Sequence, residues 1–154
     1  KPAAAALLVP RPAPIFVSGT EGSAVQYSQC CHPLPGDTVV GHLRGGHGLV
    51  LHRADCETAQ RQRVRDAGVE WGDEINGLFR CGIDLFVTDD RGVLGKVAAE
   101  IAASEANIVH ISMDGEAEKT AHLRFVLQVR DRIHLARVMR NLRRLPEVTR
   151  LMRN

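Results

Sequence analysis

Two adjacent cysteines and a later histidine–cysteine pair constrain this chain more than any other part of its sequence. Cys30 and Cys31 are followed by two prolines within five residues, and His52 and Cys56 follow after a glycine-rich segment and a short apolar run. Three thiols and one imidazole are the donor set of a closed structural zinc site. His52 and Cys56 are four residues apart and can face one point. Cys30 and Cys31 converge only at a bend, because neighbouring side chains on an extended strand point apart, and the prolines favour such a bend.

The alternative is that one or both adjacent cysteines simply pack in a small core, because free cysteine is among the most buried residue types. Four cysteines in 154 residues, with no secretion signal, favour a reduced cytoplasmic setting over a disulfide framework. Cys81 falls on the inward register of a strand and is expected in the core. No oxyanion hole or third orienting group accompanies the Cys–His pairs, so we expect no nucleophilic catalysis.

Composition indicates an ordinary globular protein of one or two domains, with 44% hydrophobic and 25% charged residues. The apolar run at residues 3–9 is too short to cross a membrane, so we expect no membrane contact. Residues 1–14 are expected to form a flexible linker. A polar stretch bounded by glycines, residues 72–77, is expected to separate a first domain at 15–72 from a second at 77–154.

The first domain is expected to be a small α+β unit. Short strands bounded by turn residues are predicted at residues 15–17, 24–27, 38–43, 49–52 and 69–71, with a hairpin turn between the first two. Asp55 is expected to cap a helix over about residues 56–66.

Hydrophobic periodicity in the second domain predicts the order strand, helix, strand, strand, helix, strand. Period-two alternation indicates strands at residues 81–88, 107–113 and 123–129, with a short last strand at 148–152. Apolar stripes of helical period follow the turn at residues 89–92 and the cap Asp131, and Pro146 ends the second helix. The prediction is an α+β fold in ferredoxin-like βαββαβ order, with both helices on one face of the sheet.

The turn into the first helix of this domain is the best candidate for a small-molecule site. Free backbone N–H groups at a helix start suit a carboxylate, and we expect this turn to lie beside the strand that begins at Asn107. Apolar side chains there favour a branched aliphatic ligand. The alternative is an ordinary capped helix. The candidate residues are Asp89, Asp90, Arg91, Gly92, Val93, Leu94, Asn107 and Ile108.

Positive charge is concentrated at the C-terminal end, where residues 130–154 contain eight arginines against two acidic residues. Such a segment can bind RNA by releasing counterions, or can be the solvated face of a helix. The second sheet lacks a base-stacking platform, because Phe125 is in the core register. Recognition of RNA by shape and phosphate is still open, and the candidate residues are Arg44, His47, Arg53, Arg137, Arg140 and Arg144.

The sequence also resembles a known family. The run from Cys30 to Asp37 matches a CC-x-P-x-PGD pattern, and the run from Gly46 to Cys56 matches G-x-G-x3-H-x3-C. Together they resemble the C-terminal regulatory region of the RelA/SpoT enzymes, the bifunctional (p)ppGpp synthetase/hydrolases of the bacterial stringent response. Residues 131–148 resemble the SpoT-type version of the ACT domain that follows in that family.

The resemblance implies a zinc-finger-like, ribosome-intersubunit domain followed by an ACT domain, with no enzyme activity in this chain. It implies that Cys30, Cys31, His52 and Cys56 hold structural zinc, and that the domains dock near the ribosomal A-site tRNA. In ACT domains the corresponding loop often receives an amino acid at a dimer interface. Valine or isoleucine would then lie against residues 92–94, 107 and 108, with Asp89 or Asp90 near the ligand ammonium.

The implied function is regulation of the parent enzyme, a GTP pyrophosphokinase and (p)ppGpp hydrolase, by switching its upstream catalytic domains. The alternative is an amino-acid-binding dimerisation module that never contacts RNA.

Overall fold

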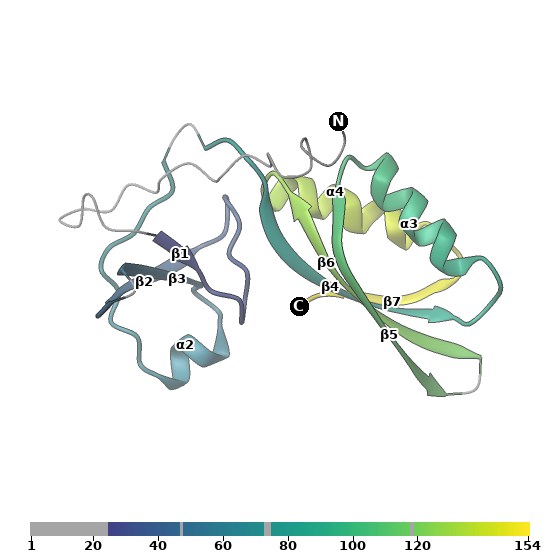
Figure 1. The fold of residues 1–154 in the computed structure, drawn as a ribbon, viewed down its shortest axis with the longest axis horizontal. Coiled ribbons are helices and arrows are strands. Elements are labelled where there is room, and N and C mark those ends of the chain that lie inside the picture. Colours follow the sequence, from purple (N-terminus) through teal and green to yellow (C-terminus); the bar gives the residue numbers. More distant parts are fainter. Residues whose placement is uncertain (1–24, 47, 73–74, 118) are drawn as a thin grey trace. The chain divides into compact units, whose positions relative to one another are not determined.

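The computed structural model describes residues 25–46, 48–72, 75–117 and 119–154 (Figure 1). The chain divides into two compact units, Lys1–Phe79 and Arg80–Asn154. The described residues form one three-stranded sheet and one four-stranded sheet, and the mixed α+β class is as predicted. The expected linker at residues 1–14 and the expected strand at 15–17 lie outside the described residues.

Unit 1 is built on a three-stranded sheet in the order β1-β3-β2, where β1 is Val25–Tyr27, β2 is Val39–Arg44 and β3 is Gly48–Arg53. The first strand runs parallel to β3, and β2 runs antiparallel to it. A tight turn joins β2 to β3, and Gly46 takes a φ of +78° there, a conformation that favours glycine.

The central strand β3 is buried on both faces. Leu49 and Leu51, both fully buried, pack with Val39 and Val69. Tyr27 and Trp71 pack against this cluster with their rings parallel and 6.2 Å apart. The indole N–H of Trp71 donates to the carbonyl of Asp37 at 2.9 Å. This bond ties the end of unit 1 back to the turn before β2.

Two local predictions for unit 1 need correction. The helix α2 covers only Glu57–Arg61, not residues 56–66, and its N-cap is Cys56, not Asp55. It ends early because Arg63 takes a φ of +49° and the N–H of Val64 bonds back to the carbonyl of Ala59. This reversal brings Val64 against the buried cysteines. The expected strand at residues 69–71 is reduced to a single bridge at Val69.

Unit 2 has the predicted βαββαβ order. Its elements are β4 (Phe79–Thr88), α3 (Val93–Ala103), β5 (Asn107–Ala117), β6 (Thr120–Val129), α4 (Arg132–Arg143) and β7 (Val148–Arg153). The strand order is β5-β6-β4-β7, so β4 and β6 are central and β5 and β7 are edges. Both helices lie on one face of this sheet (Figure 1).

The core of unit 2 follows the predicted alternation. The odd-numbered residues of β4 from Cys81 onward and of β6 are buried, whereas their even-numbered neighbours, apart from Gly82, are more exposed. The buried strand side chains are Cys81, Ile83, Leu85, Val87, Ala121, Leu123, Phe125, Leu127 and Val129. Cys81 is therefore a core residue, as predicted.

The two helices are joined by a hydrogen-bonded network around a buried histidine. His134 Nδ1 accepts from the backbone N–H of Arg130, and its Nε2 bonds the carbonyl of Ser104 at the end of α3. Arg137 donates to the same carbonyl and to the carboxylate of Glu105. The carbonyl at the end of α3 is thus satisfied by α4, and Asp131 caps α4 as predicted by accepting from the N–H of His134.

Helix α3 begins directly after the turn at residues 89–92, as predicted. Its N-cap is Gly92, with a φ of +84° and no side-chain cap bond. The N–H of Val93 instead donates to the carbonyl of Asp90. No side chain caps the helix, and Asp89 and Asp90 are both exposed.

We expect Gly41→Ala to destabilise unit 1 by about 1–3 kcal/mol, since overpacking a tight contact has that effect. A Cβ at Gly41 would lie 2.2 Å from Cγ2 of Val69. Urea denaturation followed by fluorescence of Trp71, the one tryptophan of the chain, measures the change. The matched control is Gly45→Ala, where an added Cβ meets nothing within 4 Å. Equal stability of the two variants would contradict the packing described for Gly41.

Candidate functional site

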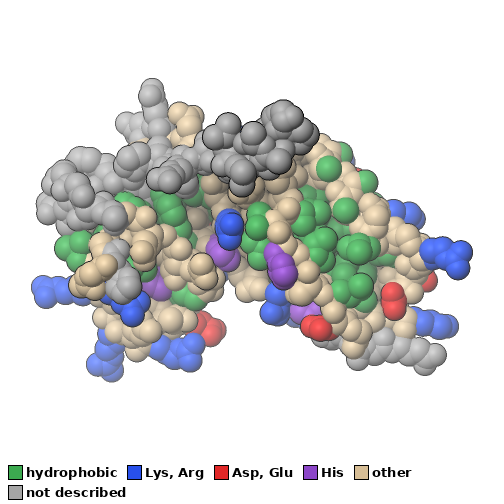
Figure 2. Space-filling view, in the orientation of Figure 1, with side chains coloured by type: hydrophobic (Ala, Val, Ile, Leu, Met, Phe, Trp, Pro, Cys, Tyr) green, Lys and Arg blue, Asp and Glu red, His purple; other side chains and the backbone are tan. Residues whose placement is uncertain are grey.

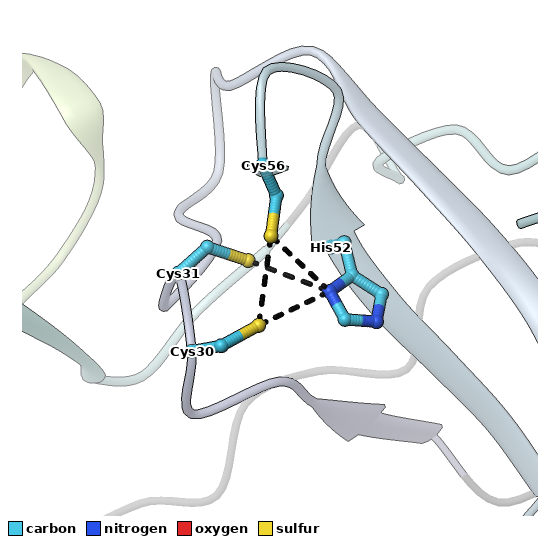
Figure 3. A group of neighbouring side chains, drawn as sticks. All are labelled: Cys30, Cys31, His52 and Cys56. Atoms are coloured by element: carbon cyan, nitrogen blue, oxygen red, sulfur yellow. Dashed lines mark hydrogen bonds between the residues drawn. The ribbon is translucent and has the colours of Figure 1, made fainter. Parts of the chain in front are cut away.

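The two adjacent cysteines and the His–Cys pair meet at one point in unit 1 (Figure 3). Cys30 and Cys31 lie in a turn after β1, His52 lies on β3, and Cys56 starts α2. The turn is closed by a bond from the N–H of His32 to the carbonyl of Ser28. The bend that lets both cysteines converge is therefore at residues 29–31, ahead of the two prolines that were expected to make it.

Four of the six distances between the donor atoms are close to those of a tetrahedral metal site, and all four atoms lie within 4.8 Å of one another. Nδ1 of His52 lies 3.3 Å from Sγ of Cys30 and 3.7 Å from the sulfurs of Cys31 and Cys56. The sulfurs of Cys30 and Cys56 are 3.5 Å apart. A tetrahedral zinc ion bound at about 2.3 Å to sulfur and 2.1 Å to nitrogen separates its donors by roughly 3.5–3.8 Å. The four side chains could therefore hold a metal ion.

The surroundings of the sulfurs differ. Burial raises the pKa of Cys31 to about 12, although a hydrogen bond from the N–H of Arg53 opposes this. Burial also raises the pKa of Cys56, but hydrogen bonds from the backbone of Ala59 and Thr58 and from the neighbouring thiols outweigh it and lower the pKa overall. Amides at the start of α2 therefore stabilise negative charge on Cys56.

The surroundings of the imidazole favour its neutral form, which can bind a metal. Burial lowers the pKa of His52, and the nearby His42 lowers it further. The two rings lie 5.6 Å apart. A neutral imidazole with Nδ1 toward three sulfurs is a ready ligand, because a protonated ring has no lone pair to donate.

We expect the protein, purified without chelator, to contain one zinc ion per chain. His52→Ala should remove most of it, because loss of one donor opens a closed four-ligand site. Zinc affinity should also fall as the pH falls, since the ion must displace protons from the thiols. Elemental analysis and a competing chelator measure both effects. Cys81→Ala in unit 2 is the control and should keep its zinc, and far less than one ion per wild-type chain would contradict the metal site.

The predicted ligand loop is open to solvent, and Gly92 has free space around it. Asp89, Asp90, Arg91 and Gly92 are exposed, and nothing lies within 4 Å of a Cβ built on Gly92. Leu94 is also exposed, whereas Val93 is buried in the core of unit 2. Val93 therefore supports the loop from beneath instead of lining a pocket.

Asn107 and Ile108 do not lie beside this loop, contrary to the expectation from sequence. The N–H of Asp89 bonds the carbonyl of Lys119, so the loop is next to the turn between β5 and β6. Asn107 and Ile108 begin β5 and pair with Gln128 and Leu127 at the other end of that hairpin (Figure 1). An 11-residue strand spans about 35 Å. In a single copy, the two halves of the predicted pocket are therefore separated by the length of β5.

The candidate RNA-binding residues fall into different environments. Arg44, Arg140 and Arg144 are exposed, whereas the side chain of Arg53 is 18% exposed and lies 3.6 Å from Asp55. Arg137 is held by Ser104 and Glu105 in the network described above. His47 lies outside the described residues.

The structure exposes a basic segment that the sequence interpretation missed. Arg61 at the end of α2 and Arg63 and Arg65 after it are exposed, whereas Val64 packs on the buried cysteines. The alternation of arginine with other residues over 61–65 was the signal that could have revealed it.

Among its described residues, unit 2 offers no ready surface for stacking a nucleic-acid base. Phe125 is fully buried, as expected from its register. Phe86 lies on the other face of the sheet, but His122 stacks on its ring at 4.4 Å and the guanidinium of Arg150 lies 5.5 Å from its centre. Side chains of the unit itself therefore cover the ring of Phe86.

Among the described residues, no helix is long and apolar enough to span a membrane.

Comparison with known proteins gives matches over nearly the whole chain. Residues 15–72 match the model of the RelA/SpoT RIS domain, and residues 76–153 match the model of the ACT domain. The bifunctional (p)ppGpp synthase/hydrolase SpoT of Escherichia coli (strain K12) is 31% identical over 142 residues, which are 90% of this chain and 20% of the relative. The bifunctional (p)ppGpp synthase/hydrolase RelA of Mycobacterium tuberculosis is 29% identical over 84% of this chain and 18% of the relative.

A crystal structure of the ACT domain from the GTP pyrophosphokinase of Chlorobium tepidum covers 50% of this chain and 99% of that chain, at 21% identity and a TM-score of 0.45. The chain spans about a fifth of the length of the curated relatives it matches.

Proposed function

The chain belongs to the RelA/SpoT family and consists of the RIS and ACT domains of its C-terminal regulatory region, and on that premise we propose that it is an amino-acid sensor. Two copies pair through their ACT domains and bind a branched-chain amino acid where they meet. Binding shifts the balance between the synthetase and hydrolase states of catalytic domains in the longer protein, a coupling between distinct sites.

The observation that carries this proposal is the separation of the two halves of the predicted pocket. Antiparallel pairing of β5 with β5 of a second copy reverses the direction of the second strand. The partner copy's Asn107 and Ile108 then come to the end of β5 that carries the β4–α3 loop. A site that is split in one copy is completed in two.

The surface around β5 supports such a pairing. This strand is an edge of the sheet, so its outer N–H and C=O groups are open to another strand. Its side chains Val109, Ile111 and Met113 are 38%, 36% and 58% exposed, and Leu94 on α3 is 39% exposed. Figure 2 shows hydrophobic side chains gathered on this face of unit 2, over β5 and α3. Solvent-exposed apolar groups at an open edge favour association.

The chemistry of the loop supports the ligand class. Backbone N–H groups at the start of α3 suit a carboxylate, and the exposed Asp89 and Asp90 suit an ammonium group. Leu94 and the partner copy's Ile108 offer apolar surface for an aliphatic side chain. Valine and isoleucine combine these three features.

A second function is favoured by the arginines of unit 1. Arg44, Arg61, Arg63 and Arg65 are exposed, and cationic side chains of this kind bind nucleic-acid backbones. We propose that the RIS domain, with zinc at its four-ligand cluster, uses them to dock on the ribosome near the A-site tRNA. The alternative is an amino-acid-binding dimerisation module that makes no RNA contact.

We expect Met113→Arg to weaken dimerisation by at least tenfold, because it places charge on both sides of a two-fold contact at an otherwise apolar edge. Sedimentation equilibrium measures the dissociation constant. Ile133→Arg is the matched control, since Ile133 is 80% exposed on α4 and not on β5. If Met113→Arg dimerises with the same dissociation constant as the wild-type protein, pairing through β5 is contradicted.

We expect valine and isoleucine to bind with a saturable heat in isothermal titration calorimetry, and Gly92→Arg to abolish it. The long side chain would fill the entrance to α3, and the positive φ of Gly92 disfavours any residue with a Cβ. Unchanged circular dichroism would show that the variant is folded. The absence of heat with the wild-type protein would contradict the sensor function and leave ribosome docking as the surviving proposal.

We expect ribosome affinity to fall steeply with salt. Replacing Arg61, Arg63 and Arg65 together by alanine should reduce the slope of log affinity against log salt by roughly 0.7–0.9 for each phosphate that these arginines neutralise. Arg124→Ala is the control, because Arg124 donates to Asp84 within unit 2. Ribosome binding that is undetectable at low salt would favour the alternative without RNA contact.

A further inference from the structure

The thiols of the four-ligand cluster differ in their access to solvent. Cys30 is exposed, whereas Cys31, His52 and Cys56 are 2%, 5% and 6% exposed. Cys31 and Cys56 also pack with Ala59 in a small apolar cluster, with Val40 and Val64 beside it. A reagent that arrives from solvent therefore reaches the sulfur of Cys30 first.

A second sulfur stands next to this accessible one. Sγ of Cys56 is 3.5 Å from Sγ of Cys30, and Figure 3 shows the two side chains pointing toward each other from the turn after β1 and from the start of α2. An accessible thiol with a neighbouring thiol that can resolve it is the arrangement of a reversible oxidation site. The remaining cysteine, Cys81, is fully buried in the core of unit 2.

We propose that Cys30 is an oxidation site and that its product is a disulfide to Cys56 that expels the metal. The oxidant is hydrogen peroxide. While zinc is bound, both sulfurs are thiolates. The thiolate of Cys30 attacks one peroxide oxygen and breaks the O–O bond, and one proton from solvent completes a sulfenic acid and one molecule of water. The thiolate of Cys56 then attacks the sulfur of Cys30, the S–S bond forms, and the sulfenic oxygen leaves with a second solvent proton as a second water.

Formation of the disulfide removes two of the four zinc ligands. The two cysteines lose two electrons and the peroxide gains them, so no further redox partner is required. Cys31 and His52 are then the two donors left, and two donors do not make a closed zinc site. A dithiol returns the bridge to two thiols, and zinc rebinds.

The inference rests on the proposed metal site but is tested separately from it. The full chain, loaded with zinc, is titrated with hydrogen peroxide, and released zinc is read with a chelating dye. We expect one zinc to be released per chain, and peptide mapping under non-reducing conditions to show Cys30 linked to Cys56. Dithiothreitol and zinc should restore the starting state.

Variants distinguish the assigned pair from other thiols. Cys81→Ala should release zinc and form the bridge like the wild-type protein. Cys31→Ser should still form the bridge even where it holds zinc poorly, so a loss of metal affinity does not obscure the result. A disulfide between Cys31 and Cys30 or between Cys31 and Cys56 would overturn the proposal. Zinc that stays bound after excess peroxide would overturn it too.

If the purified chain holds no zinc, the metal site fails, but peptide mapping of the metal-free chain still decides which cysteines pair.

Discussion

The path of unit 1 depends on the meeting of three sulfur atoms and one imidazole nitrogen. The four donors come from the turn after β1, from β3 and from the start of α2, so their convergence fixes three segments at one point. The apolar clusters of this unit are small, and small domains often need a metal or disulfide in addition to a core. The reversal after α2 follows from the same constraint, because it brings Val64 onto the buried cysteines.

The sequence predicted the structure best where one hydrophobic period continues over many residues. Residues 81–88 and 123–129 alternate without interruption, and the strands β4 and β6 carry their odd-numbered side chains into the core as expected. Asp131 was identified as a helix cap because a helical apolar stripe follows it directly. Where many residues support one period, tertiary contacts seldom override it.

Local and long-range details were less predictable. The expected helix at residues 56–66 shortened to five residues, because the contact of Val64 with the cysteine cluster is tertiary and leaves no periodic signal. Arg137 was counted among surface charges, but the structure commits it to the carbonyl of Ser104. The separation of Asn107 from the β4–α3 loop was also missed. That separation follows from the predicted order, because β4 and β5 are joined through one helix and run parallel, so the end of β4 and the start of β5 lie at opposite ends of the sheet.

Because the proposed pocket is divided between two copies, the extent of ligand binding depends on the concentration of the protein as well as on that of the amino acid. A ligand that binds only the paired state stabilises that state, and dilution of the protein weakens apparent ligand affinity. A sensor of this design responds to the product of two quantities, the amino-acid level and its own abundance. The same amino-acid level would then produce a weaker response in a cell that contains fewer copies of the protein.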